Sequence, residues 1–584
     1  MRRQQRVQYA VMWLAIGGCL LLPALGVGAD KTYDVEVRAN VMIPMRDGVK
    51  LAAHIFLPKA EGKFPVLLSR TPYGKGSTNN GQARFFAAHG YVYISQDCRG
   101  KGDSQGKWVP FMNEGRDGYD THRWILAQPW CNGTIGTAGG SYVGYTQWIS
   151  APGAGKYLKA MLPIVPLVDP YHDVAYVGGA FELALLMGWG SGVSGVPTVR
   201  TWSGKRWEAA YRTLPLRTWD KTVGHKIQYL RDWVAHWRYD DYWAACSIRD
   251  RMHDIVTPMY VVGGWYDIFA KSALEHFNTV RSKSRSPEAR RHQYIMMGPW
   301  AHGITRDGKV GELNFGEQAI PDLRSLSIQW YDHWLKGKKT GVEKWPPVRI
   351  FVMGKNQWRD EQEWPLARTK YTPYYLHSSG RANALAGNGT LSIAKPSGPE
   401  PLDQYIYDPH DPVPTLGGCN LTGCPAGPHD QTRAEQRPDV LVFTSAPVTK
   451  ELEVTGPIKM VLYAASSAPD TDWTAKLVDV YPDGRPINLC DGIIRARFRQ
   501  SADRPSLLQP YKVYRYEIDL WVTSNVFLPG HRIRVEISSS NFPRFDRNPN
   551  TGHAFGADAE LATAIQTVYH DAKHPSHILL PIIP

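Results

Sequence analysis

The 584-residue chain has little of what marks several common protein classes. It contains no long run of lysine or arginine, although its formal net charge is +13. It contains no internal repeat, no long low-complexity tract and no recognisable nucleic-acid-binding module. Nucleic-acid-binding proteins gather their basic residues into patches or known modules. The scattered charge therefore indicates a solvated basic surface and predicts no nucleic acid partner.

Cysteine is also scarce, with seven residues in the chain. A zinc site needs further Cys or His at close spacing, and none stands out, so we expect no metal and no cofactor. Six cysteines follow Cys19, and in an exported protein an even number permits disulfides. The best candidate pair is Cys419 and Cys424, because the glycine-rich loop that carries them can bend to join them.

Residues 1–29 predict a secretory signal peptide. Three arginines precede an apolar run over 10–25, and small residues at 27–29 offer a cleavage site. The weaker alternatives are a membrane anchor, for which the apolar run is short, and a lipoprotein attached at Cys19. Cleavage removes the three arginines and no acidic residue, which leaves a net charge of +10. We therefore expect a periplasmic or secreted protein without a stable membrane anchor.

The length predicts two or three domains, and the first part of the chain alternates strands with helices. A hairpin is expected around Asp47-Gly48. Further strand-like and helix-like segments follow it. The apolar runs are 65–69, 91–95, 135–138, 259–262 and 294–297, and a segment that fits a helix is 118–128. This alternation predicts an α/β domain with a mostly parallel sheet, formed by residues 30–164 and 251–340.

Residues 165–250 interrupt this rhythm. Seven tryptophans lie between Trp189 and Trp243, in helix-compatible segments such as 202–211 and 225–236. We interpret the stretch as a helical cap inserted into the α/β domain. Extra helices packed outside the sheet are the alternative.

Strand-like alternation dominates after a polar, glycine-bearing stretch near residues 334–341. In 531–538, for example, Ile533, Val535 and Ile537 point to one side and the charged residues between them to the other. Many such short runs are separated by Pro, Gly and Asp turns. Residues 341–584 are therefore expected to form a β-sandwich or jelly roll.

Ser141 is the most informative residue of the chain. It follows the small residues that end the strand-like run 135–138, and a helix-like stretch begins directly after it. This layout is typical of a nucleophile elbow, although the spacing is G-x-S-x-x-G and not the commoner G-x-S-x-G. A serine hydroxyl needs a base and a carboxylate that orients the base. Asp267 and His302 each follow a later strand, in the chain order that this fold requires.

The strings around Tyr73, Ser141, Asp267 and His302 resemble the X-Pro dipeptidyl-peptidase-like serine hydrolases. This group includes cocaine esterase and the α-amino-acid ester hydrolases. The resemblance runs from about residue 33 to the C-terminus and includes the strings at 96–104, 117–120, 140–144 and 427–431. It implies an α/β-hydrolase domain with an inserted helical cap and a C-terminal jelly-roll (galactose-binding-like) domain.

The resemblance also implies roles for single residues. Ser141 would be the nucleophile, His302 the general base and acid, and Asp267 the residue that orients His302. The backbone N–H of Tyr142 and the hydroxyl of Tyr73 would form the oxyanion hole. The aromatic-rich composition suits a pocket for apolar acyl groups, and we interpret Trp148 and Trp265 as its lining, with structural packing as the alternative.

The expected function is that of an exported serine hydrolase, which cleaves small-molecule carboxylic esters or amides through an acyl-enzyme on Ser141. No acid follows Asp267 in Ile268-Phe269-Ala270, and Asp173 alone is no carboxylate cluster, so an obligatory α-amino group is not expected. The first alternative is an X-Pro dipeptidyl peptidase or another aminopeptidase-type hydrolase. The second is a carbohydrate- or surface-binding protein with an inactive hydrolase domain. The sequence leaves a homo-oligomer open.

Overall fold

The computed structural model describes residues 32–196, 199 and 202–584. The predicted signal peptide lies outside the described residues. Within the part of the chain that is described, no helix combines the length and the apolar character needed to cross a membrane.

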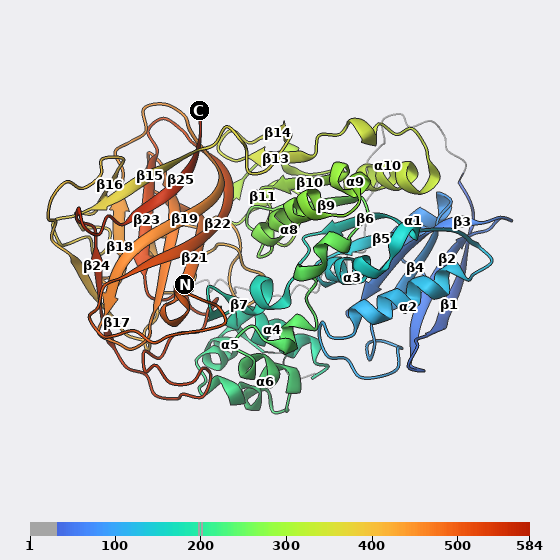
Figure 1. Cartoon of the computed structure of the whole chain (residues 1–584), viewed down its shortest axis with the longest axis horizontal. Helices are drawn as coiled ribbons and strands as arrows, with labels where there is room; N and C mark the ends of the chain where they lie inside the picture. The colour runs from blue at the N-terminus through green and yellow to red at the C-terminus, as the bar shows by residue number, and fades with distance from the viewer. Residues whose placement is uncertain (1–31, 197–198, 200–201) are drawn as a thin grey trace, which may run out of the picture.

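The first half of the chain builds a mainly parallel sheet (Figure 1). Its strand order is β1-β2-β4-β3-β5-β6-β9-β10-β13-β14. Neighbouring strands from β4 to β13 are parallel, whereas β1, β2 and β14 are antiparallel additions at the two edges. The bounds are β1 (Val35–Pro44), β2 (Lys50–Pro58), β3 (Phe64–Thr71), β4 (Val92–Asp97), β5 (Cys131–Gly140), β6 (Leu158–Ile164), β9 (Met259–Gly264), β10 (Gln293–Gly298), β13 (Val348–Val352) and β14 (Gln357–Glu361).

Helices cover both faces of this sheet. On β5, an added Cβ at Gly136 would meet Leu335 and Tyr331 of α10, whereas one at Gly139 would meet Val143 of α3. These glycines are three positions apart, so they face opposite sides of the strand. The helices are α1 (Gly81–Ala88), α2 (Glu114–Leu126), α3 (Tyr142–Ser150), α8 (Ala270–Lys283), α9 (Pro287–Arg291) and α10 (Leu323–Lys336). The hairpin at Asp47-Gly48 and all five strands named from the sequence are confirmed.

The stretch 165–250 leaves the sheet and folds into short helices. They are α4 (Leu183–Val193), α5 (Gly204–Tyr211), α6 (Gln228–Ala235) and α7 (Asp241–Ala244), with the small hairpin β7 (Tyr176–Val177) and β8 (Ala180–Phe181) before them. Tryptophans form much of their packing. Trp189 stacks on Trp233 at 6.2 Å and Trp207 on Trp219 at 6.4 Å. Figure 1 shows these helices below the sheet, in contact with the C-terminal domain.

The C-terminal domain is rich in strands and forms the jelly roll at the left of Figure 1. Its pairing is antiparallel except for a single parallel pair between β16 and β18. The bounds are β15 (Lys370–His377), β16 (Thr390–Ser392), β17 (Asp403–Tyr407), β18 (Leu441–Thr444), β19 (Leu452–Ser466), β20 (Asp472–Val480), β21 (Pro486–Arg495), β22 (Tyr514–Phe527), β23 (Arg532–Ser538), β24 (Ala564–Tyr569) and β25 (His577–Ile583). The predicted α/β fold with a β-rich C-terminal domain is confirmed.

The sheet of the α/β domain continues past the expected boundary at residue 340. It does so because β13 adds parallel to β10 and β14 then turns back along it. On the charged side of β23, Arg532 is exposed, whereas Arg534 pairs with Glu435 in the interior and Glu536 lies near Lys476. Buried ion pairs therefore take up part of this charged side.

The expected disulfide between Cys419 and Cys424 is also wrong, because both cysteines are free. Gly418 and Gly427 pair through their backbones and close the loop. Inside this loop, the side-chain amide of Asn420 donates hydrogen bonds to the backbone carbonyls of Gly417 and Pro425. The thiol of Cys419 instead lies 3.6 Å from the carbonyl oxygen of Trp265.

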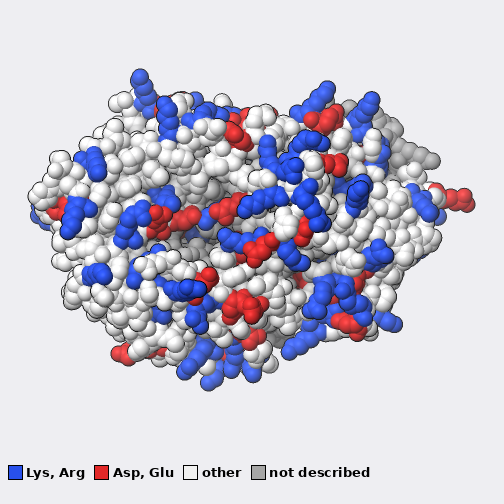
Figure 2. Space-filling model, in the orientation of Figure 1, with Lys and Arg blue, Asp and Glu red and all other residues white. Residues whose placement is uncertain are grey.

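The surface carries charge of both signs. On the face in Figure 2, Lys and Arg lie next to Asp and Glu across the middle of the molecule. Exposed ion pairs elsewhere in the described chain include Lys459–Glu517 and Lys355–Glu451, each at 2.6 Å.

Candidate active site

Ser141 lies at the sharp turn between β5 and α3. Its backbone φ of 59° and ψ of −127° fall outside the regions that L-residues ordinarily occupy. Its N–H donates to the carbonyl of Ile164 at 2.9 Å. The turn requires glycine at Gly139, where φ is 135° and an added Cβ would lie 2.2 Å from Cγ1 of Val143. A strained serine held between a strand and a helix is the geometry of a nucleophile elbow.

Asp267 and His302 form a buried pair. Asp267 follows β9, His302 follows β10, and Nδ1 of His302 lies 2.8 Å from Oδ1 of Asp267. Asp267 is fully buried, and its second carboxylate oxygen has no hydrogen-bond partner among the described residues. With a proton held on Nδ1, the neutral ring presents Nε2 as an acceptor. Phe269 packs edge-on against the ring at 5.4 Å.

These residues gather at one edge of the sheet. β5, β9 and β10 are parallel members of it, so their carboxyl ends share that edge. The hydrogen bonds of the described residues do not include one between Ser141 Oγ and His302. Catalytic hydrogen bonds often tighten only once substrate is bound.

Tyr73 lies in the loop after β3 with its hydroxyl turned toward the elbow. The hydroxyl accepts a hydrogen bond from Nε1 of Trp189 at 3.3 Å. Burial of the hydroxyl raises the pKa of Tyr73 to about 12, and the interactions with Trp189 and Ser141 oppose this rise. The residue is nevertheless 42% exposed. The phenol is therefore protonated at neutral pH, and a ligand can reach it.

Tyr142 has its backbone at the elbow and its side chain in the interior. Its N–H belongs to the first residue of α3, so no carbonyl within the helix accepts it. Its hydroxyl accepts from the N–H of Phe111 at 2.7 Å and donates to Oε1 of Glu114 at 3.1 Å. Glu114 in turn pairs with buried Arg70 at 3.0 Å. Sequence reasoning missed this support beneath the elbow, because no local signal links Glu114 to Tyr142.

Trp148 and Trp265 do not line an accessible pocket, and that interpretation is wrong. Both are completely buried. Trp148 of α3 packs against His276 of α8, with ring centroids 6.3 Å apart. Trp265 donates to the carbonyl of Phe351 at 2.7 Å and packs on Trp364. Both belong to the core, which was the alternative.

Trp189 of α4 is a tryptophan that the fold brings to the site. It is partly exposed, and it contacts Tyr142 at 6.1 Å and Phe111 at 5.9 Å in addition to its bond to Tyr73. The cluster of seven tryptophans was the signal in the sequence, but that cluster did not single out Trp189.

Asp173 is committed to partners within the protein. Its carboxylate accepts backbone N–H groups of Val168 and Asp169 at 2.9 and 2.8 Å and a hydrogen bond from Ser272. His276 lies 3.6 Å away. Burial raises the pKa of Asp173, but the hydrogen bond and charge of His276, with smaller contributions from the backbone and Ser272, lower it to about 2. Asp173 therefore fastens the cap to α8 and does not present a carboxylate for an ammonium group.

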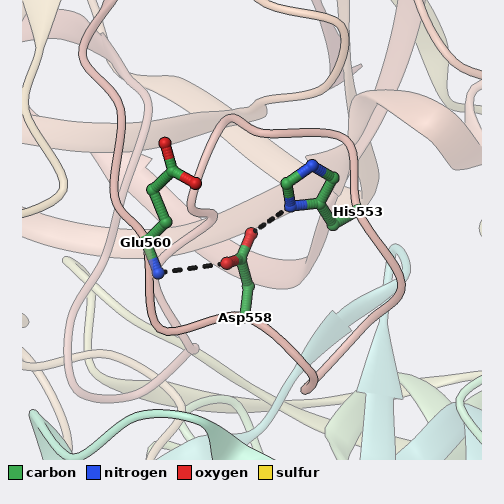
Figure 3. Close-up of side chains that lie close together, drawn as sticks. All are labelled: His553, Asp558 and Glu560. Carbon is green, nitrogen blue, oxygen red and sulfur yellow. Dashed lines mark hydrogen bonds and ion pairs between the residues drawn. The ribbon is translucent and has the colours of Figure 1, made fainter.

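One cluster of possible metal ligands lies away from this site, on a loop of the jelly roll (Figure 3). It consists of His553, Asp558 and Glu560. His553 Nδ1 is already 2.9 Å from Asp558, and the backbone N–H of Glu560 donates to the same carboxylate. These hydrogen bonds account for the arrangement, and we assign it no role.

The elbow serine, the Asp–His pair and the parallel sheet define an α/β-hydrolase. Residues 47–304 match the model of the X-Pro dipeptidyl-peptidase (S15) family, and residues 340–579 match that of the X-Pro dipeptidyl-peptidase C-terminal non-catalytic domain. The chain belongs to this S15 family of serine hydrolases.

Relatives match over nearly the whole chain. Cocaine esterase of Rhodococcus sp. (strain MB1 Bresler) is 41% identical over 95% of this chain and 99% of that protein. The crystal structure of an aminopeptidase from a marine sediment thaumarchaeon has a TM-score of 0.80 and 27% identity, covering 97% of this chain and 99% of the other. An α-amino acid ester hydrolase has a TM-score of 0.77 and 27% identity, covering 96% and 98%. The family resemblance seen in the sequence is confirmed.

Proposed function

We propose that the protein hydrolyses carboxylic esters, and the related amides, through an acyl-enzyme on Ser141. His302 takes the proton from Ser141 Oγ as the oxygen attacks the acyl carbon, and it then donates this proton to the leaving group. Asp267 keeps the ring oriented and stabilises its charged form. Water then attacks the acyl-enzyme with His302 as base, which releases the acid and restores Ser141.

The negative charge of each tetrahedral intermediate would fall on the acyl oxygen. Two donors are available beside Ser141, the N–H of Tyr142 and the hydroxyl of Tyr73. Preorganised donors of this kind stabilise the developing charge without reorganising during the reaction, and loss of one typically costs about 100- to 1000-fold in rate. The protonated state of Tyr73 suits it to this role.

The buried hydrogen bond between Asp267 and His302, at the sheet edge that carries Ser141, supports this proposal most strongly. A solvated loop histidine would have no reason to meet a fully buried carboxylate. The name of the 41% identical relative, a cocaine esterase, agrees with ester hydrolysis. This geometry also argues against a surface-binding protein with an inactive hydrolase domain.

We further propose an acyl group that is apolar or aromatic and carries no obligatory amine. The partly exposed ring of Trp189 flanks the site, and a ring of this kind favours apolar acyl groups. Ile268-Phe269-Ala270 directly after Asp267 contains no acid, and Asp173 is satisfied within the protein. The second candidate is an aminopeptidase-type activity, favoured by the aminopeptidase among the structural matches.

Export is part of the proposal. The three arginines, the apolar run and the small residues at the N-terminus support a cleaved signal. N-terminal sequencing of the protein from the periplasm or medium of an expressing cell should begin at Asp30. A mature cytoplasmic protein that retains residues 1–29 would refute export.

A substrate panel tests the activity. Wild type should turn over p-nitrophenyl acetate and benzoate faster than amino-acid esters, β-lactam amides or X-Pro anilides, and Ser141→Ala should abolish this turnover. A serine-reactive phosphonate should label Ser141 in the wild type only. A wild type that shows neither turnover nor labelling would refute the hydrolase assignment. Selective turnover of X-Pro anilides would favour the second candidate.

A further inference from the structure

Helix α4 of the cap is attached to the jelly roll at its first turn. The first N–H groups of a helix have no acceptor within it. Here the N–H of Ala184 donates to the carbonyl of Pro543 at 3.0 Å. Just before the helix, Phe181 and Asp546 exchange hydrogen bonds of 2.8 and 2.9 Å. The jelly roll therefore supplies hydrogen-bond acceptors for backbone N–H groups at the start of α4 and just before it.

Arg544 lies at the centre of this seam. It is 2% exposed, and its Nη1 lies 2.7 Å from Asp491 on β21. Its Nε donates to Oε1 of Glu182, the N-cap residue of α4, at 3.3 Å. Asn541 bonds the other oxygen of Asp491 at 2.8 Å. A planar, buried guanidinium thus connects a strand of the jelly roll to the N-cap residue of the helix.

The same helix carries Trp189, whose indole N–H donates to the hydroxyl of Tyr73 at 3.3 Å. The ring of Trp189 is held between Trp233, which it stacks on at an angle of 8°, and Phe111. Both the direction of this N–H and its distance from Tyr73 therefore depend on where α4 lies.

We propose that Arg544 is a positioning residue for the hydroxyl of Tyr73, acting through Glu182, helix α4 and the indole of Trp189. This inference rests on the proposed role of Tyr73 as an oxyanion donor. The residues of the C-terminal domain lie outside the elbow and the Asp–His pair. The proposed role of Arg544 would nevertheless give this domain a part in the acyl-transfer step.

A tyrosine hydroxyl has a single proton and two lone pairs. When Trp189 donates to a lone pair, the O–H of Tyr73 points away from the indole and remains free for the developing oxyanion. A donor to the phenol oxygen also polarises its O–H and strengthens the bond that the O–H makes. Because a displacement of about 1 Å in a catalytic group can cost about 100-fold in rate, a shift of α4 would lower kcat.

Four variants and their pairwise combinations test this inference. They are Arg544→Lys, Trp189→Phe, Tyr73→Phe and the matched control Arg534→Lys. Arg534 is also buried and lies 2.6 Å from Glu435. Burial raises the pKa of Glu435 and of Glu182 alike to about 7. Arg534 lies on β23 and bonds Thr444 of β18, so its pair is internal to the jelly roll.

On a p-nitrophenyl ester that the wild type turns over, we expect Arg544→Lys and Trp189→Phe each to lower kcat about 10-fold, the effect of one hydrogen bond. KM should change less than about 2-fold, since the interaction acts in the transition state. Arg534→Lys should lower the melting temperature and leave kcat unchanged. In the Tyr73→Phe background, Arg544→Lys and Trp189→Phe should each change kcat less than about 2-fold, because coupled residues are not additive.

The inference is overturned if folded Arg544→Lys leaves kcat unchanged, or lowers kcat equally with and without the hydroxyl of Tyr73. If Arg544→Lys does not fold, the isosteric Glu182→Gln takes its place under the same criteria. These outcomes differ from a failure of the proposed function, in which the wild type itself would show no turnover and no phosphonate labelling.

Discussion

Replacement of Asp267 by asparagine gives the most direct test of the site. The carboxylate lies 2.8 Å from Nδ1 of His302 and is fully buried, so water has no access to replace it. Its second oxygen has no partner among the described residues, so little besides the ring would orient an amide there. An amide N–H₂ turned toward Nδ1 would force the proton onto Nε2, the nitrogen that must accept the proton of Ser141.

We expect kcat of Asp267→Asn to fall roughly 10³- to 10⁴-fold, as in other enzymes where the orienting carboxylate becomes an amide. This equals about 4 to 5.5 kcal/mol of transition-state stabilisation. KM should change by less than about 3-fold, because Asp267 makes no contact with the substrate in the proposed mechanism. Initial rates with a p-nitrophenyl ester measure both constants.

Asp479→Asn is the matched control. Its Oδ1 lies 2.8 Å from Nδ1 of His531, and both residues are buried in the jelly roll. The substitution therefore breaks the same kind of pair at the same distance, away from Ser141. It should lower the melting temperature and leave kcat within about 2-fold of wild type. A fall of less than 10-fold in Asp267→Asn, or an equal fall in Asp479→Asn, would refute the assigned role of Asp267.

Three further predictions concern the structure itself. Gly139→Ala should lower the free energy of unfolding in urea by about 3 kcal/mol, because φ is 135° and the new Cβ would lie 2.2 Å from Val143; wild-type stability would contradict the elbow geometry. The lowered pKa of Asp173, about 2, predicts stability that is present above pH 3.8 and lost as pH falls toward 2. Asp173→Asn should make the free energy of unfolding depend less on pH between 3.8 and 2. An unchanged pH dependence would argue against the role of the buried carboxylate. Alkylation in denaturant without reductant should modify Cys419 and Cys424, whereas a disulfide-linked peptide would show that they pair.

The parts of the fold that the sequence predicted well are set by local patterns. β3, β5, β9 and β10 are short apolar runs bounded by turn residues, and each lies where its run predicts. The positions of Ser141, Asp267 and His302 follow directly, since each is the polar residue just after a strand. In a parallel sheet the ends of such strands share an edge, so local patterns were enough to bring these residues together.

Burial of polar and aromatic groups was predicted less well, because it depends on what packs against them. The aromatic-rich composition suits an apolar pocket, and Trp148 and Trp265 were the predicted lining. In the fold Trp148 meets α8 and Trp265 meets β13, and these elements cover both rings. The charged side of β23 has the pattern of a solvated surface, but Glu435 comes from a segment about 100 residues away and pairs with Arg534 in the interior.

The surroundings of Tyr73 show the limit of sequence reasoning most clearly. Its hydroxyl meets Trp189, and the helix of Trp189 starts beside Arg544. These residues belong to the α/β domain, the cap and the jelly roll, so no spacing in the sequence joins them. Pairing with neighbouring strands fixes where a strand ends, and this in turn fixes the place of the residue that follows the strand. The direction of a hydroxyl depends instead on side chains that only tertiary packing brings near. A family motif can therefore name Tyr73 as an oxyanion donor, but the residues that hold its proton in place become visible only in the folded chain.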